Sequence, residues 1–227
     1  NNFIVGCSHI YSSNGQGMKY KLSRLNDFTL DHKNNPYLSE EEAYKLGVSI
    51  KELFFKSFSE LPKRVVVHKR TRFTENEING LVNSLIGKGI EQLDLIEINY
   101  EDSARFFELK NGDIDGFPVR RGTCFPISKN TALLYTHGIA PSVRNPKYKY
   151  IQGGKGLPVP LKVVKHYGQS DINLIGSEIL GLSKMNWNSF ELYSKLPCTI
   201  ESANVISRIG RYLDYFDGKI YDYRNFM

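Results

Sequence analysis

The sequence contains few of the residues that mark exported, zinc-binding or membrane-spanning proteins. It has three cysteines, Cys7, Cys124 and Cys198, and no CxxC pair, which argues against a disulfide framework and against a zinc site. We therefore expect a reducing, cytoplasmic location. No apolar run approaches the roughly 18 residues that are needed to span a bilayer, so we expect no membrane partner.

Acidic residues are missing from two stretches of the chain. No Asp or Glu precedes Asp27, and none lies between Gly116 and Ser170, where there are nine Lys and Arg. The rest of the chain has 21 Lys and Arg against 24 Asp and Glu, so the net charge of +6 comes from this stretch. A basic segment with interspersed tyrosines and glycines is typical of a surface that follows a phosphate backbone. The alternative interpretation is a solvated basic face without a partner.

The first half of the chain predicts a hairpin followed by a βαβ unit. Strand-forming residues on both sides of a turn-rich segment predict a β-hairpin over 3–11 and 18–25. Ser39 and Glu42 form a capping-box pattern before a helical apolar pattern that ends at Pro62. The βαβ unit consists of a strand at 64–68, a helix that Thr74 and Glu77 cap and that runs to about Ile86, and a strand at 93–98. Its crossover implies that part of the sheet is parallel.

The second half predicts further strands and two closing helices. Strands are expected over 119–125, 131–135 and 159–165, a loop over 138–158, and helices over 172–182 and from about Thr199. These elements describe an α/β fold with a mixed sheet. We expect one compact domain.

Four strings, in the same order, resemble the PIWI domain of Argonaute proteins, particularly the prokaryotic ones. They are RVVVHKRTRFTENEINGL (64–81), VRRGTCF (119–125), LLYTHG (133–138) and the segment 175–209, which contains KMNWN and LPCT. The resemblance implies an RNase H-like fold, with a mixed central β-sheet flanked by helices, over residues 1–227. It also implies guide-directed binding or cleavage of nucleic acid. The family's MID domain has no counterpart here, so we expect a fragment that lacks it, or a MID domain on another chain.

The resemblance also indicates a loss of catalysis. Hydrolysis of a phosphodiester by two divalent cations requires several carboxylate ligands. The matching strings place Ser8, Lys69 and Asn204 where the family has metal ligands, and none of the three is a carboxylate. The family's remaining glutamate falls near Glu40, Glu41 or Glu42, without a fixed position. We therefore expect an inactive nuclease fold without a catalytic metal pair, in which Lys69 occupies the space of a cation and contacts phosphate.

The predicted function is to hold a guide strand and its paired target without cutting, in prokaryotic defence against invading DNA. We expect an RNA guide, a DNA target and an effector-bearing partner protein. The side chains expected to bind nucleic acid are cationic or amide groups: Lys69, Arg70, Arg120, Arg121, Arg144, Lys147, Lys149, Lys155, Lys165, Lys184, Asn186 and Asn188. By resemblance, one Mg²⁺ bridges the guide's 5′ phosphate and the C-terminal carboxylate of Met227.

Two alternatives remain open from the sequence. One is an active RNase H-like metal-dependent endonuclease whose ligands come from Asp94, Glu97, Asp102 or Asp171. A first strand that carried Asp27 or Asp31 instead of Ser8 would favour it. The other is a protein-interaction scaffold, which the acid-free stretch argues against.

Overall fold

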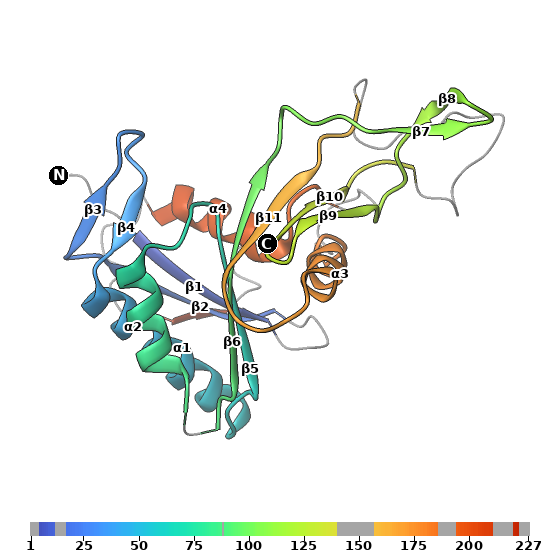
Figure 1. The fold of residues 1–227 in the computed structure, drawn as a ribbon. Helices are drawn as coiled ribbons and strands as arrows, with labels where there is room; N and C mark the ends of the chain where they lie inside the picture. The colour runs from blue at the N-terminus through green and yellow to red at the C-terminus, as the bar shows by residue number, and fades with distance from the viewer. Residues whose placement is uncertain are drawn as a thin grey trace. The chain divides into compact units, whose positions relative to one another are not determined.

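The computed structural model describes residues 5–11, 17–87, 89–139, 157–185, 194–210 and 220–222 (Figure 1). The chain forms two compact units. Unit 1 contains residues 1–96, 166–169 and 199–227, and unit 2 contains residues 97–165 and 170–198. None of the described helices is both long and apolar enough to cross a membrane.

The strands form one mixed five-stranded sheet and three smaller sheets. The large sheet has the order β5 (Arg64–Lys69), β6 (Gln92–Tyr100), β11 (Leu161–Tyr167), β10 (Thr131–Leu134), β9 (Cys124–Ser128). β10 is antiparallel to both of its neighbours, whereas β5 and β6 are joined by a helical crossover. The smaller sheets are β1 (Val5–Tyr11), β2 (Gly17–Arg24) and β12 (Ile220–Asp222); β3 (Phe28–Leu30) and β4 (Pro36–Leu38); and β7 (Phe107–Lys110) and β8 (Asp113–Pro118).

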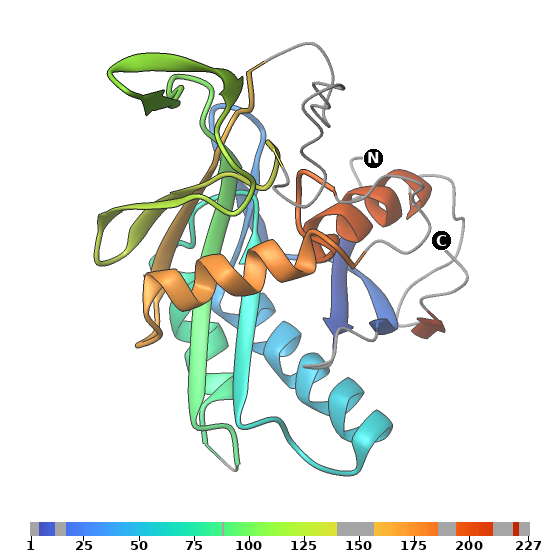
Figure 2. The same ribbon diagram turned by 90° about the vertical axis from the view of Figure 1, so that its right-hand side faces the viewer.

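In unit 1, helices α1 (Glu40–Phe58) and α2 (Glu75–Leu85) lie side by side (Figures 1 and 2). Their apolar faces join Leu93 and Leu95 of β6 in one buried cluster. The two helices approach closely because glycine lies at the contact: a Cβ on Gly80 would be 2.3 Å from the carbonyl oxygen of Glu40. This core fixes α2, and with it the end of β5 that precedes α2.

In unit 2, helix α3 (Ile172–Leu182) packs on β9 and β10 (orange in Figure 2). Asp171 caps α3 by accepting a hydrogen bond from the Asn173 N–H at 2.8 Å. A Cβ on Gly176 would lie 3.1 Å from Cys124 Sγ, so glycine lets the helix approach β9 closely. Helix α4 (Cys198–Gly210) follows, with most of its residues in unit 1.

Most of the predicted elements are confirmed. Both capping residues, Ser39 and Thr74, cap the helices they were expected to cap, and the 172–182 helix has the predicted bounds. The strand predicted at 119–125 begins only at Cys124, because a turn with Gly122 at φ 91° precedes it, and β11 begins two residues later than predicted. The 140–156 part of the predicted loop lies outside the described residues.

Two features of the strand arrangement differ from expectation. The hairpin β1–β2 pairs with β12 in a separate sheet, where we expected one mixed sheet. The hairpins β3–β4 and β7–β8 were not predicted. The expectation of one domain over residues 1–227 stays a prediction.

Candidate functional site

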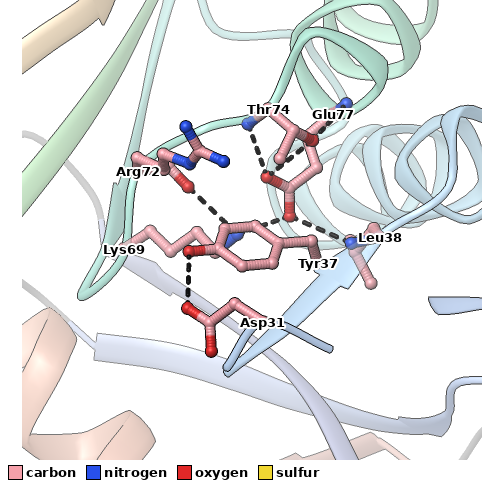
Figure 3. A network of polar contacts seen from close by, with 7 residues as sticks. All are labelled: Asp31, Tyr37, Leu38, Lys69, Arg72, Thr74 and Glu77. Carbon is pink, nitrogen blue, oxygen red and sulfur yellow. Dashed lines mark hydrogen bonds and ion pairs between the residues drawn. The ribbon is translucent and has the colours of Figure 1, made fainter. Parts of the chain in front are cut away.

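The strand β5 ends at Lys69, the position where the resemblance predicts a lost catalytic carboxylate. The Lys69 ammonium forms an ion pair with Glu77, the third residue of α2 (Figure 3). It also lies 4.6 Å from the ring centroid of Tyr37, 5.5 Å from that of Phe73, and 3.5 Å from the carbonyl oxygen of Arg72. The cation is therefore enclosed by a carboxylate, a carbonyl and two aromatic rings of the same unit.

Glu77 is the centre of this network. One carboxylate oxygen accepts hydrogen bonds from Lys69 and, at 3.1 Å, from the Leu38 N–H of β4. The other accepts from the Thr74 N–H at 2.9 Å and from the Thr74 hydroxyl at 3.3 Å. Glu77 is 2% exposed, so its charge requires a nearby cation to be stable. This one carboxylate connects β4, β5 and α2.

The other two positions at which the resemblance predicts a lost metal ligand lie on β1 and α4. Ser8 belongs to β1, and Asn204 is a half-buried residue of α4. The first turn of α4 is tied to β5 by a contact of 2.8 Å between His68 Nδ1 and Thr199 Oγ1. Burial lowers the pKa of His68 from 6.5 to about 4, with the charge of Arg64 as a second cause, so this ring is neutral near pH 7.

The three glutamates expected near the fourth ligand position form the first turn of α1. Lys45 lies 2.7 Å from Glu41 and 3.2 Å from Glu42, so one lysine forms ion pairs with both. The hydrogen bonds that the Lys45 ammonium donates to these two carboxylates raise the pKa of Lys45. Glu40 is exposed. The first turn of α1 therefore places Glu41 and Glu42 beside a cation of the same helix.

The carboxylates of the nuclease alternative have other local partners. Asp94 is 1% exposed and lies 2.8 Å from Arg64 Nε. Glu97 accepts a hydrogen bond from the Asn99 side-chain amide at 2.7 Å, and Asp171 is the N-cap of α3. Asp102 is exposed. No group of three or more His, Cys, Asp or Glu that could hold a metal ion occurs among the described residues.

The first strand, which we named as the discriminating feature, is β1 and contains Ser8. Asp27 and Asp31 lie on either side of β3 instead. Hydrogen bonds from Asn35, and further ones from Lys33 and Tyr37, lower the pKa of Asp31 from 3.8 to about 2. Asp31 therefore stabilises the turn between β3 and β4.

Six of the twelve residues predicted to bind nucleic acid are among the residues that the structure describes. Arg121 donates to the Leu180 carbonyl at 3.2 Å and to Ser183 Oγ at 2.6 Å, so its guanidinium stabilises the C-terminal end of α3. Lys184 is exposed and follows directly, which brings it to the same end of α3. The Lys165 ammonium donates a hydrogen bond to the Ser170 carbonyl at 2.7 Å, and Arg120 is exposed. Lys69 and Arg70 lie at the end of β5. The remaining residues, Arg144, Lys147, Lys149, Lys155, Asn186 and Asn188, lie outside the described residues, as does Met227.

A second basic cluster, in unit 2, was missed from the sequence. The Lys195 ammonium lies 4.2 Å from the ring centroid of Tyr100, and Thr136 Oγ1 holds the Lys195 carbonyl at 2.5 Å. Burial lowers the pKa of Lys195; the charge of Arg105 lowers it further, and that of Asp102 opposes the shift. Neither Lys195 nor Arg105 forms an ion pair with any carboxylate that the structure describes. Arg105 donates to the backbone carbonyls of Asp102 and Ala104, both at 2.8 Å. A partly buried ammonium on an aromatic ring, with a guanidinium nearby, favours the binding of an anion.

The signal for this cluster was present in the sequence but weak. Tyr100, Arg105 and Lys195 lie outside the acid-free stretch, and Glu101 and Asp102 follow Tyr100 directly. A search for unopposed charge therefore passes over them. Only the fold brings residue 195 back to the end of β6.

Comparisons with known proteins point to Argonautes. No protein-family model matches the chain. The chain is 26% identical over 207 residues to the protein argonaute of Aquifex aeolicus (strain VF5), a match that covers 90% of the chain and 24% of that protein. The chain therefore spans about a quarter of the length of this curated relative.

Solved Argonaute structures share the fold. Clostridium butyricum Argonaute bound to a guide DNA and a 19-mer target DNA superposes with a TM-score of 0.67 at 18% identity, over 98% of this chain and 28% of that one. Aa-Ago with externally bound siRNA gives a TM-score of 0.61 at 21% identity, over 99% and 30%. Marinitoga piezophila Argonaute in complex with 5′ OH guide RNA and target DNA gives a TM-score of 0.61 at 17% identity, over 93% of this chain and 29% of that one. The mixed α/β fold is thus that of a part of these Argonautes.

Proposed function

We propose that this chain is the PIWI domain of an Argonaute-like protein and that it binds a guide strand and its paired target without cutting the target. Its similarity to an Argonaute over 90% of its length supports the family, and its fold supports the domain. The neighbour from Marinitoga piezophila holds guide RNA and target DNA, which supports the same pair of strands here.

One observation carries the inactive part of the proposal. At the end of β5 the chain presents an ammonium, Lys69, that is held by the buried Glu77, at a position where metal-dependent cleavage would need a carboxylate. A divalent cation beside Lys69 would be repelled by that charge. The buried carboxylate of Glu77 is already used by Lys69 and by Thr74, the N-cap of α2. The chemistry that remains is binding through backbone contacts, with base pairing as the source of sequence specificity.

The first prediction is that the full-length protein does not cut. A fully paired guide–target duplex incubated with the protein and Mg²⁺ or Mn²⁺ should give no discrete product opposite the middle of the guide, as read on a denaturing gel. An active RNase H-type enzyme in the same buffer is the control. A discrete cut that Glu40→Ala, Glu41→Ala or Glu42→Ala abolishes would overturn the proposal.

The second prediction concerns the basic cluster of Arg105 and Lys195. The double variant Arg105→Gln/Lys195→Gln should bind a labelled guide–target duplex about tenfold more weakly at low salt. The slope of log K against log[salt] should become shallower by about one to two units, because each lost phosphate contact removes about 0.7 to 0.9. The matched control Lys110→Gln/Lys129→Gln removes two exposed cations of the same unit and should change the slope little. Equal slopes for the two double variants would contradict this assignment.

The partners and the metal complete the proposal. We infer that a MID domain, in the same chain or on another one, holds the 5′ end of the guide, and that an effector-bearing protein acts with the complex in defence against invading DNA. If Met227 is the last residue of the full-length protein, we further propose that its carboxylate and the guide's 5′ phosphate would share one Mg²⁺, because a carboxylate and a phosphate repel each other without a cation between them.

A further inference from the structure

The loop between β5 and α2, residues 70–74, is held firmly at its centre. Phe73 is 6% exposed, and its ring lies 5.9 Å from that of His166. The Arg72 carbonyl accepts from the Lys69 ammonium at 3.5 Å. Thr74 is the N-cap of α2. The backbone of Arg72 is therefore fixed on both sides, while Arg72 as a residue is exposed.

The Arg72 guanidinium lies over the ring of Tyr37, with its central carbon 5.8 Å from the ring centroid. Within the described part of the chain it forms no ion pair. The two nearby carboxylates of the network are committed elsewhere: Glu77 to Lys69, Leu38 and Thr74, and Asp31 to Lys33, Asn35 and Tyr37. Glu75, in the first turn of α2, is exposed.

The two cations of this network thus have different roles. Lys69 points inward and neutralises a buried carboxylate, which leaves the outward guanidinium of Arg72 as the uncompensated charge. At the start of α2, the N–H groups of Thr74 and Glu77 are used by the capping box. Beside Arg72, the Thr71 hydroxyl is buried without a hydrogen-bond partner among the described residues. A planar guanidinium that already lies against an aromatic ring loses little side-chain entropy when it binds an oxyanion.

We propose that Arg72 contacts a backbone phosphate of the bound nucleic acid, and that Lys69 is a positioning residue that holds the loop through Glu77 without touching the ligand. This inference rests on the proposed function. It replaces the expectation that Lys69 itself contacts phosphate, because the Lys69 ammonium already lies against Glu77 and the Tyr37 and Phe73 rings.

The test compares variants of the full-length protein in binding a fluorescein-labelled guide–target duplex across a salt series. Arg72→Gln should raise Kd about fivefold at low salt and make the salt slope shallower by about one unit, as expected for one lost phosphate contact. The matched control Lys56→Gln removes an exposed cation of the same unit and should leave both values near those of the wild type. Circular-dichroism melting should show that both variants are folded.

The role of Lys69 is tested with the charge-balanced variant Lys69→Met/Glu77→Gln, which leaves no buried charge unpaired. It should also raise Kd, and adding Arg72→Gln to it should have almost no further effect, because the loop no longer presents Arg72. Equal effects of Arg72→Gln in the two backgrounds would overturn the positioning role. If the wild type binds the duplex but Arg72→Gln has the same Kd and salt slope as Lys56→Gln, the role of Arg72 is wrong and the proposed function stands. If the wild type does not bind the duplex, the proposed function itself is wrong.

Discussion

Replacing Glu77 with alanine is expected to lower the free energy of unfolding by about 3–5 kcal/mol. The variant leaves the Lys69 ammonium without its carboxylate, and that side chain is only 25% exposed. It also removes the acceptor for the Leu38 and Thr74 N–H groups. Loss of the capping box at the start of α2 alone costs about 1 kcal/mol.

The measurement is urea unfolding followed by circular dichroism, with Glu75→Ala as the matched control. Glu75 lies in the same first turn but is exposed, so its replacement should change the free energy by no more than about 0.5 kcal/mol. The charge-balanced variant Lys69→Met/Glu77→Gln should be more stable than Glu77→Ala, since it removes both buried charges. If Glu77→Ala and Glu75→Ala have the same stability, the network does not hold this region together.

Helix starts were predictable from the sequence because their signals are local. Ser39 and Thr74 each lie three residues before a glutamate, and both cap the expected helix. The same local interpretation could not find that Glu77 also binds Lys69 and the Leu38 N–H, since Leu38 is 39 residues away in sequence. That Lys69 lies at a functional site stays a prediction, and the pairing of its side chain depends on contacts that only the tertiary fold brings together.

The hairpin β7–β8 had a clear local signal that our prediction did not use. Asn111 and Gly112 connect its strands, with φ values of 55° and 90°. Two successive positive φ values are what a type I′ turn requires, and Asn-Gly is the favoured pair. The hairpin β3–β4 has strands of only three residues and no such pair, so its turn depends instead on the hydrogen bonds to Asp31.

Counting charges along the sequence predicted a basic surface but not which cations form it. Arg121 and Lys165 belong to the acid-free stretch, yet both donate to backbone carbonyls of their own unit. Arg72, Arg105 and Lys195 lie outside it and have no carboxylate partner among the described residues, although Arg105 also donates to the backbone carbonyls of Asp102 and Ala104. A backbone carbonyl can bind a cationic side chain without appearing in any count of acids, so a count of charges along the sequence does not show which cations have carboxylate partners.

Replacing Gly168 with alanine is expected to lower the free energy of unfolding by at least about 3 kcal/mol. Gly168 has φ 115°, and a Cβ there would lie 2.1 Å from Asp94 Oδ1 and 2.6 Å from the Leu93 carbonyl oxygen. To make room, Asp94 would have to move, although it is 1% exposed and lies 2.8 Å from Arg64 Nε. The new methyl group therefore strains the backbone and disturbs a buried ion pair.

Gly87→Ala separates these two effects. Gly87 belongs to the same unit and has φ 97°, but nothing lies within 4 Å of its Cβ position, so alanine there adds only the backbone strain of about 1 kcal/mol. The free energies of unfolding of the two variants, measured by urea unfolding, should therefore differ by about 2 kcal/mol or more, with Gly168→Ala the less stable. Equal losses would mean that Asp94 moves away without cost, and that the contact between Asp94 and Arg64 contributes little to holding β5 and β6 in place.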